Sequence, residues 1–301
     1  MKPVLIDDGL IKERLTPDRA VAWIRDALRD HADGRLVAPP RATADLAGHR
    51  LMITAGLRRE DWYGYRSYLA PGSGDDDQVV VVQDLATGRV RGIATGTELG
   101  PRRTGAIGGV AADLLARTDA TTLALIGTGR QARAQLDAIR TVRALSEVRC
   151  FSPTERHRRA FADRAQTEFG VLCVATGDAR SAVEGADLVV LATDSPVPVI
   201  DPAWLAPGCF VSTLGPKQVG RAEFGPDLVD AVQLAATDST DQLAGYQPPN
   251  ILAGTPQADR VVALGDLLTG RAVGRTTPDQ KTLFLSVGLA GTEAYLLARM
   301  L

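Results

Sequence analysis

A glycine-rich segment in the middle of the chain has the residue types and spacing that bind a dinucleotide. Gly127-Thr128-Gly129-Arg130-Gln131-Ala132 follows an apolar run, Leu123 to Ile126, and precedes a helix-like stretch. The first glycine of such a turn permits the tight bend, the second admits a pyrophosphate, and the small third residue lets helix pack on strand. The motif alone is weak evidence, because a Gly-rich turn between a core strand and helix looks the same. The strand–helix alternation that follows favours a bound dinucleotide.

The residues after the next expected strand, 148–151, indicate which dinucleotide is bound. Enzymes that use NAD usually place Asp or Glu there, ~20 residues past the glycines, to bind the ribose 2′-hydroxyl. Here the strand is followed by Ser152, with Thr154 and Arg156 behind it. Hydroxyl and guanidinium groups suit a 2′-phosphate, so we expect NADP(H) in preference to NAD(H). In the alternative, Glu155 reaches the ribose and the arginines form a solvated helix face.

Composition narrows the class of protein. The chain has 301 residues, enough for two domains, with 45% hydrophobic and 23% charged residues. A net charge of −2 argues against a nucleic-acid partner. No apolar run approaches the ~18 residues of a membrane span, and the N-terminus lacks an apolar signal region. Cys150, Cys173 and Cys209 lack metal-ligand spacing, and no cluster of histidines and acids has it either. We therefore expect a cytoplasmic protein with free thiols, no bound metal and no membrane partner.

The elements that must position the glycine motif follow from the apolar pattern. We predict an α/β fold: a Rossmann-type doubly wound parallel sheet in residues 117–275, plus an α+β substrate and dimerisation domain of residues 1–116 with 276–301. The first domain is expected to hold a helix at 17–33 and a largely antiparallel sheet. A bridging helix at 97–116 and an apolar closing helix at 288–301 complete it. The predicted strands are 50–55, 63–69, 78–84 and 89–95 in the first domain, and 121–126, 148–151, 171–175, 187–193, 209–214 and 231–236 in the second.

An ordered set of segments resembles the ornithine cyclodeaminase/mu-crystallin family, and the resemblance spans essentially the whole chain. It implies a Rossmann domain, a substrate domain whose sheets pair into a homodimer, and redox chemistry at a carbon–nitrogen bond of a small molecule with a nicotinamide cofactor. The segments are Pro40-Arg41, Arg103-Thr104-Gly105-Ala106, the glycine motif with Gln131, Asn250-Ile251-Leu252, Gly265 to Gly270, and Phe284-Leu285-Ser286-Val287-Gly288.

The resemblance also implies roles for single residues. In the family, arginines and a lysine hold the substrate carboxylate, and Arg41 and Arg103 match those arginines. Arg66 stands at the position of the lysine. Arginine still binds a carboxylate but does not exchange its proton near neutral pH, so proton transfer must come from elsewhere or from water. To the cofactor we also assign Thr104 beside Arg103, and Thr193 and Gly215 after the expected strands.

Two departures from the family pattern bear on the reaction. Lys217 replaces the aspartate that activates the amine in cyclodeaminases, and Arg50 replaces an expected acid in a looser match. A cation at the first position disfavours ornithine cyclisation. It favours an imine reductase or an amino-acid dehydrogenase, in which Lys217 is the ionisable group above the nicotinamide. Alternatively, Lys217 is a surface lysine in a polar loop. For the function as a whole, the second hypothesis is a nucleotide-binding protein that has lost catalysis.

Five cations, Arg41, Arg50, Arg66, Arg103 and Lys217, are expected to converge on one pocket. Burying them around a single carboxylate would leave excess positive charge, which is costly. We therefore expect a carboxylate-bearing substrate with a second anionic group.

Overall fold

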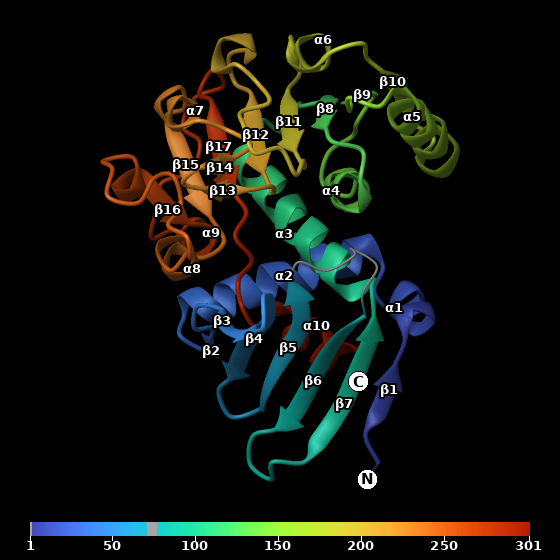
Figure 1. The fold of residues 1–301 in the computed structure, drawn as a ribbon, viewed down its shortest axis with the longest axis vertical. Coiled ribbons are helices and arrows are strands. Elements are labelled where there is room, and N and C mark those ends of the chain that lie inside the picture. Colours follow the sequence, from blue (N-terminus) through green and yellow to red (C-terminus); the bar gives the residue numbers. More distant parts are fainter. Residues whose placement is uncertain (1, 71–76) are drawn as a thin grey trace.

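The parallel sheet expected in the second half of the chain is present, and the fold class is confirmed. The computed structural model describes residues 2–70 and 77–301. The sheet has eight strands, all parallel, in the order β10-β9-β8-β11-β12-β17-β15-β16 (Figure 1). Its strands are β8 (Thr122–Ile126), β9 (Glu147–Phe151), β10 (Leu172–Ala175), β11 (Leu188–Leu191), β12 (Phe210–Thr213), β15 (Leu234–Thr237), β16 (Val261–Ala263) and β17 (Thr282–Leu285).

Helices cover both faces of this sheet because its central strands are apolar on both faces. Every residue of β11, β12 and β17 is buried, as expected for parallel strands between helices. The short hairpin of β13 (Lys217–Gln218) and β14 (Arg221–Ala222) follows β12. The helices are α4 (Arg130–Ile139), α5 (Glu155–Phe169), α6 (Ala179–Val183), α7 (Pro226–Asp230), α8 (Thr240–Ala244) and α9 (Leu264–Thr269), with 3-10 turns at Pro202–Trp204 and Ala258–Arg260.

One predicted domain boundary needs correction. Residues 276–301 were expected to belong to the first domain, but β17 pairs with β12 on one side and β15 on the other. The chain therefore returns to the first domain only after Leu285. The strand was missed because its four buried residues form too short an apolar run to be assigned from pattern alone.

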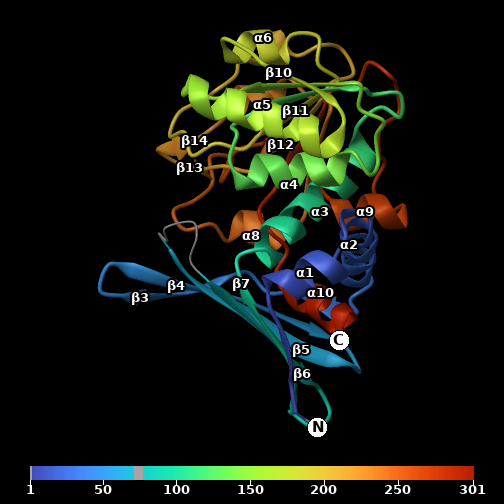
Figure 2. The ribbon, with the colours of Figure 1, turned by 90° about the vertical axis from the view of Figure 1, so that its right-hand side faces the viewer.

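The first part of the chain forms a second sheet with helices on one face. Its order is β1-β7-β6-β5-β4-β2, with β3 paired to β4, and all pairs except β1 with β7 are antiparallel. Figure 2 shows α1, α2 and α10 on one side of the sheet and the β3–β4 hairpin projecting beyond the body. The elements are β1 (Val4–Ile6), α1 (Asp8–Arg14), α2 (Pro17–Ala32), β2 (Leu36–Val37), β3 (Ala42–Leu46), β4 (His49–Arg58), β5 (Trp62–Ala70), β6 (Gln78–Asp84), β7 (Val90–Gly96) and α10 (Thr292–Met300).

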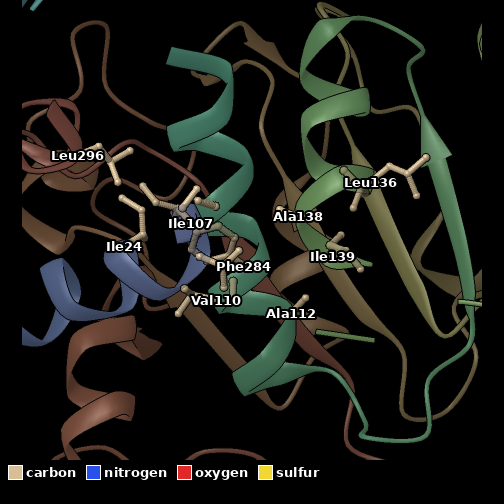
Figure 3. Close-up of a cluster of buried hydrophobic side chains, with 14 of the residues drawn as sticks. Ile24, Ile107, Val110, Ala112, Leu136, Ala138, Ile139, Phe284 and Leu296 are labelled. Atoms are coloured by element: carbon tan, nitrogen blue, oxygen red, sulfur yellow. The ribbon is translucent and has the colours of Figure 1, made fainter. Parts of the chain in front are cut away.

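Helix α3 (Leu99–Leu115) joins the two parts and fixes their relative position. Ile107 and Val110 on α3 pack in one cluster with Ile24 of α2, Leu136 of α4 and Phe284 of β17 (Figure 3). Small residues on α3 allow α4 to approach closely: a Cβ at Gly105 would lie 2.4 Å from the carbonyl oxygen of Ala134. The core is therefore continuous across both sheets.

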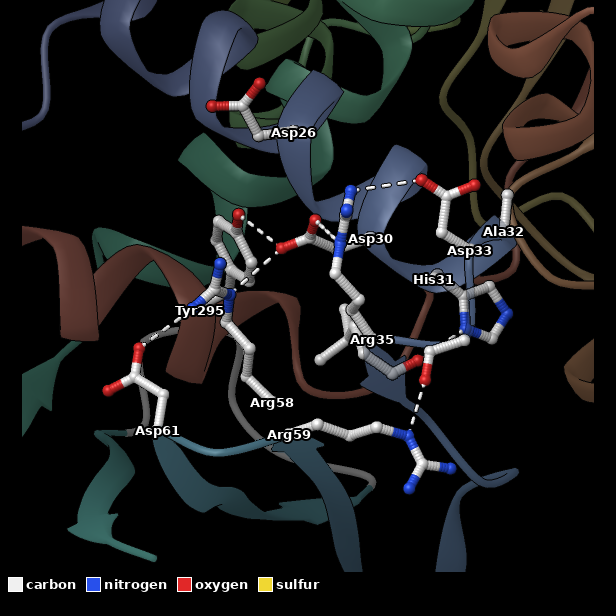
Figure 4. Close-up of polar contacts among 12 residues, drawn as sticks. Asp26, Asp30, His31, Ala32, Asp33, Arg35, Arg58, Arg59, Asp61 and Tyr295 are labelled. Carbon is white, nitrogen blue, oxygen red and sulfur yellow. Dashed lines mark hydrogen bonds and ion pairs between the residues drawn. The ribbon is translucent and has the colours of Figure 1, made fainter.

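A buried carboxylate holds the closing helix in place. Asp30 of α2 accepts hydrogen bonds from Arg35 Nε (2.8 Å), Arg58 Nε (3.0 Å) and the Tyr295 hydroxyl (3.0 Å), as Figure 4 shows. Burial alone would raise the pKa of Asp30, but the bonds from Arg58, Tyr295 and Arg35 outweigh burial and lower the pKa. Because Tyr295 lies on α10, this cluster fixes the orientation of the helix that also carries Glu293.

Two further expectations from the sequence concern the cysteines and membrane-spanning helices. The three cysteines are free and buried, as expected. No helix within residues 2–70 and 77–301 combines the length and the hydropathy needed to span a bilayer.

Candidate active site

The carboxyl ends of four strands of the parallel sheet open onto a cavity of about 510 Å³. Open α/β sheets bind their ligands at this edge. The opposite wall is formed by β5, β6 and the first turns of α3, so the cavity lies between the two parts of the fold. Its lining includes Gly129, Arg130, Gln131, Ala192, Thr193, Asp194, Leu214, Gly215, Ser286, Val287 and Gly288 on one side, and Arg41, Arg66, Tyr68, Gln78, Gly100, Pro101, Arg103, Thr104 and Tyr246 on the other.

The glycine motif has the geometry that a dinucleotide requires. Gly127 has φ +105°, and a Cβ there would lie 2.1 Å from the carbonyl oxygen of Ala192, so only glycine fits. A Cβ at Gly129 would meet nothing within 4 Å, which leaves open space above the N-terminus of α4. The buried Gln131 Oε1 has no hydrogen-bond partner among residues 2–70 and 77–301. The open space at this helix N-terminus fits a bound pyrophosphate. The unpaired Gln131 oxygen can accept a hydrogen bond from an N–H or O–H group of a ligand.

The predicted cofactor residues fall into two groups. Thr104, Gly129, Arg130, Gln131, Thr193 and Gly215 line the cavity itself. The others lie around the end of β9: the Thr128 hydroxyl donates to Ser152 Oγ (3.1 Å), while Thr154 and Arg156 are exposed at the start of α5. The structure therefore brings the second group to the place where the adenosine ribose of a dinucleotide lies in this fold class.

Two of the predicted substrate arginines share a buried carboxylate that sequence reasoning missed. Glu293 Oε1 accepts hydrogen bonds from Arg66 Nη1 (2.7 Å) and from Arg103 Nε (2.8 Å) and Nη2 (2.5 Å). Burial would raise the pKa of Glu293, but the charges of Arg103 and Arg66 outweigh it and lower the pKa to about 2. A lone acid in the apolar segment 288–301 was the available signal, since a buried acid needs a cationic partner.

Arg66 and Arg41 keep hydrogen-bonding capacity for a ligand. Arg66 Nε is buried and has no partner within the described residues. Arg41 reaches the same cavity from the other side, where its Nη2 donates to the Val287 carbonyl (2.8 Å) and its buried Nε is likewise unpaired within residues 2–70 and 77–301. Unpaired buried guanidinium donors are costly, and a ligand carboxylate would satisfy them.

A second missed acid shapes the loop between β17 and α10. The two carboxylate oxygens of Asp238 accept the backbone N–H groups of Val287 (2.8 Å), Gly288 (2.8 Å) and Leu289 (2.7 Å). Asp238 is 1% exposed, so it acts as a fixed support for this wall of the cavity.

Lys217 does not face the cavity, and the expectation that it lies above the nicotinamide needs correction. Its side chain is 2% exposed, so it is not a surface lysine either. Its Nζ donates to the carbonyl oxygens of Gly215 (2.7 Å) and Leu214 (3.4 Å). The physical reason is the neighbouring Glu223, whose buried carboxylate attracts the ammonium group.

Glu223 in turn supports two cavity loops. Its carboxylate accepts from the backbone N–H groups of Thr193 (3.0 Å) and Gly215 (2.6 Å). Burial raises the pKa of Glu223, although these bonds and the charge of Lys217 act in the opposite direction. Lys217 and Glu223 therefore lie behind two loops that line the cavity.

Arg50 is not brought to the cavity lining. It lies on the same face of β4 as Thr54, which pairs with Arg66, but at the exposed end of the strand. The expected convergence of five cations is thus reduced to Arg41, Arg66 and Arg103, and Glu293 neutralises one of them.

Comparison with known proteins identifies a family. The model of the ornithine cyclodeaminase/mu-crystallin family matches residues 10–300. A Δ1-pyrroline-2-carboxylate reductase of Bacillus cereus is 33% identical over 217 residues, which cover 70% of this chain and 66% of that protein.

Solved structures of low identity share the fold. An archaeal alanine dehydrogenase dimer with bound NAD has a TM-score of 0.88 at 22% identity, covering 100% of this chain and 95% of that chain. The iminosuccinate reductase of Paracoccus denitrificans in complex with NAD+ has a TM-score of 0.88 at 22% identity, covering 99% and 95%.

Proposed function

Because the chain belongs to the ornithine cyclodeaminase/mu-crystallin family, we propose that it is an NAD(P)H-dependent oxidoreductase acting on the carbon–nitrogen bond of a carboxylate-bearing substrate. The observation that carries the proposal is the cavity, which places the dinucleotide loop and three arginines around one space. The relative's reductase activity on a cyclic imino acid supports the same reaction type.

Each group of residues has a separate task in this proposal. Arg41, Arg66 and Arg103 bind the substrate carboxylate through the N–H groups that Glu293 and Val287 leave available. Gly129, Gln131, Thr193 and Gly215 hold the cofactor. A bound reduced nicotinamide supplies the hydride for the carbon of the C=N bond. Anchoring the carboxylate fixes that carbon in place, which converts an encounter of two molecules into an oriented reaction.

Cyclodeamination of a diamino acid remains less suited to this chain. The position of the amine-activating aspartate carries Lys217, which is buried and donates to the carbonyl oxygens of Gly215 and Leu214, with the charge of Glu223 nearby. An additional carboxylate on the substrate is favoured by one observation: Arg41, Arg66, Arg103 and Glu293 together carry a net formal charge of +2. A dicarboxylic imine would balance the charge of these four groups, whereas a monocarboxylate would leave one unit of it.

The reaction is tested by following the loss of reduced-cofactor absorbance with a panel of substrates. The panel contains Δ1-pyrroline-2-carboxylate, the six-membered cyclic analogue, and 2-oxo acids with ammonia or methylamine, each in mono- and dicarboxylic form. We expect turnover of at least one imine, and higher kcat/KM for dicarboxylic members. Tight cofactor binding without turnover of any member would instead favour a non-catalytic nucleotide-binding protein.

For the cofactor, we predict a lower KM for NADPH than for NADH. Ser152 replaces the acid that would repel a 2′-phosphate, and Arg156 is exposed close by at the start of α5. Arg156→Ala should raise the KM for NADPH about tenfold and leave that for NADH unchanged, since a hydrogen bond to a charged group contributes roughly 1.5–3 kcal/mol. Arg159→Ala is the matched control, because Arg159 already pairs with Glu155 at 2.6 Å. A clear preference of the unmodified protein for NADH would overturn the prediction.

We also predict a homodimer formed through the first sheet. The sheet face opposite α10 exposes Tyr65, Leu69 and Val79: Tyr65 and Leu69 lie on β5, and Val79 of β6 pairs with Ser67, which lies between them on the same face. An exposed apolar sheet face of this kind marks an interface. Light scattering at micromolar concentration should give twice the chain mass, and Val79→Glu should shift it toward the monomer. Val273→Glu, at an exposed loop position, is the control and should leave the measured mass unchanged. A monomer mass for the unmodified protein would rule the dimer out.

A further inference from the structure

The proposed reaction needs a proton donor, and the arginine at position 66 cannot supply one. Reduction of a C=N bond adds a hydride to carbon and a proton to nitrogen. The guanidinium of Arg66 does not exchange its proton near neutral pH, and Lys217 is turned away from the cavity. The donor must therefore be sought among the other side chains that line the cavity, or be water.

Among residues 2–70 and 77–301, three lining side chains carry an acidic proton or its acceptor: Tyr68, Asp194 and Tyr246. Asp194 is exposed and follows Thr193 in the loop after β11 of the parallel sheet. It lies on the opposite side of the cavity from Arg41, Arg66 and Arg103. Tyr246 lies near Arg41, with the guanidinium carbon 6.0 Å from its ring centroid. Tyr68 lies two residues after Arg66 on β5, on the same face of the strand, and its ring centroid is 4.1 Å from the Arg66 guanidinium carbon.

Two guanidinium groups, those of Arg66 and Arg103, lie close to Tyr68. Arg66 and Arg103 share the single carboxylate of Glu293, so the cluster keeps one net positive charge. Arg103 also lies within electrostatic reach of the Tyr68 hydroxyl. Positive charge nearby stabilises a phenolate that forms during the reaction. The Arg66 guanidinium carbon lies 4.1 Å from the Tyr68 ring centroid, closer than the 6.0 Å between the Arg41 guanidinium carbon and the Tyr246 ring centroid.

We propose that Tyr68 is the proton donor of this site, a role that rests on the proposed reductase function. The phenol O–H of Tyr68 gives its proton to the imine nitrogen while the carbon is reduced, and the phenolate is then reprotonated by water. Tyr68 is only partly buried, so solvent can reach it between turnovers. In the oxidative direction the same phenolate accepts the proton from the amine. Arg66 thus anchors the carboxylate and stabilises the charge on Tyr68.

The kinetic test compares three Tyr→Phe variants, each of which keeps the ring. Tyr68→Phe should lower kcat at least about 100-fold with little change in KM, as expected for loss of a general acid. Tyr63→Phe is the control on the same strand, because its hydroxyl bonds Gln83 outside the cavity. Unchanged kcat in Tyr68→Phe, or a loss found only in Tyr246→Phe, would overturn the proposal. If the unmodified protein reduces no imine of the panel, the proposed function itself fails.

A binding test examines Tyr68 without any turnover. Tetrahydro-2-furoate carries a ring oxygen where the imine nitrogen would lie, whereas cyclopentanecarboxylate has no acceptor there. By calorimetry, the unmodified protein should bind the furoate roughly fivefold more tightly, the effect of one neutral hydrogen bond. Tyr68→Phe should abolish this difference while binding cyclopentanecarboxylate as before. Equal binding of both probes to the unmodified protein, or loss of both in the variant, would show that Tyr68 does not donate to the ligand.

Discussion

Replacement of Glu293 with glutamine should lower the free energy of unfolding by about 3–5 kcal/mol, because it leaves two buried arginines without their counter-charge. Glu293 is 1% exposed, and Arg66 and Arg103 are 8% and 7% exposed, so water cannot compensate. Urea denaturation at neutral pH measures the change. Glu168→Gln is the matched control, since its ion pair with Arg133 is exposed and such pairs contribute roughly 0–1 kcal/mol. Coincident denaturation curves for Glu293→Gln and the unmodified protein would contradict the prediction.

The difference in unfolding free energy between the unmodified protein and Glu293→Gln should also depend on pH, and the direction of that dependence can be predicted. The pKa of Glu293 falls from its ordinary 4.5 to about 2 in the folded state. A carboxyl whose pKa is lowered by folding stabilises the protein above its unfolded pKa, and this contribution is lost as the pH falls through the folded value. The stability difference between the unmodified protein and Glu293→Gln should thus be constant above pH 4.5 and shrink toward pH 2. A difference that grows on acidification would have the wrong sign.

Gly129→Ala should fold normally and bind the dinucleotide roughly 100-fold more weakly, the effect of ~3 kcal/mol of overpacking against a ligand. In this structure a Cβ at residue 129 would meet nothing within 4 Å, and the φ of Gly129 is −85°, which alanine adopts freely. The added methyl group would occupy the space that the pyrophosphate needs. Fluorescence titration with NADPH and thermal denaturation together measure both parts of the prediction.

Two other Gly→Ala variants serve as controls, one expected to disrupt folding and one expected to change nothing. Gly127→Ala should destabilise the fold itself, because φ is +105° and the Cβ would lie 2.1 Å from a backbone oxygen. Gly274→Ala, where a Cβ also meets nothing within 4 Å, should change neither folding nor binding. Full cofactor affinity in Gly129→Ala would mean that the dinucleotide does not cross this loop.

Features that depend on short stretches of chain could be predicted from the amino-acid sequence. The glycine motif, the buried strands β8 and β11 and the helix that begins at Pro17 are encoded in adjacent residues: the spacing of apolar residues, a positive-φ glycine and a proline at the first helical position. The order of such segments was sufficient for the fold class and the family. These signals are local, so they could be read without knowing which segments meet.

The tertiary structure alone decided how the charges of the site are paired. Arg103 and Glu293 are 190 residues apart in the chain, yet they share a buried ion pair. Lys217 could have faced the cavity or the solvent, but the fold buries it with the carbonyl oxygens of Gly215 and Leu214 as partners and the charge of Glu223 nearby. In the same way β17 lies between β12 and β15 because of partners far from it in sequence. The cost of burying a charge or a strand edge depends on what the whole fold places beside it, which residue type and local spacing do not encode.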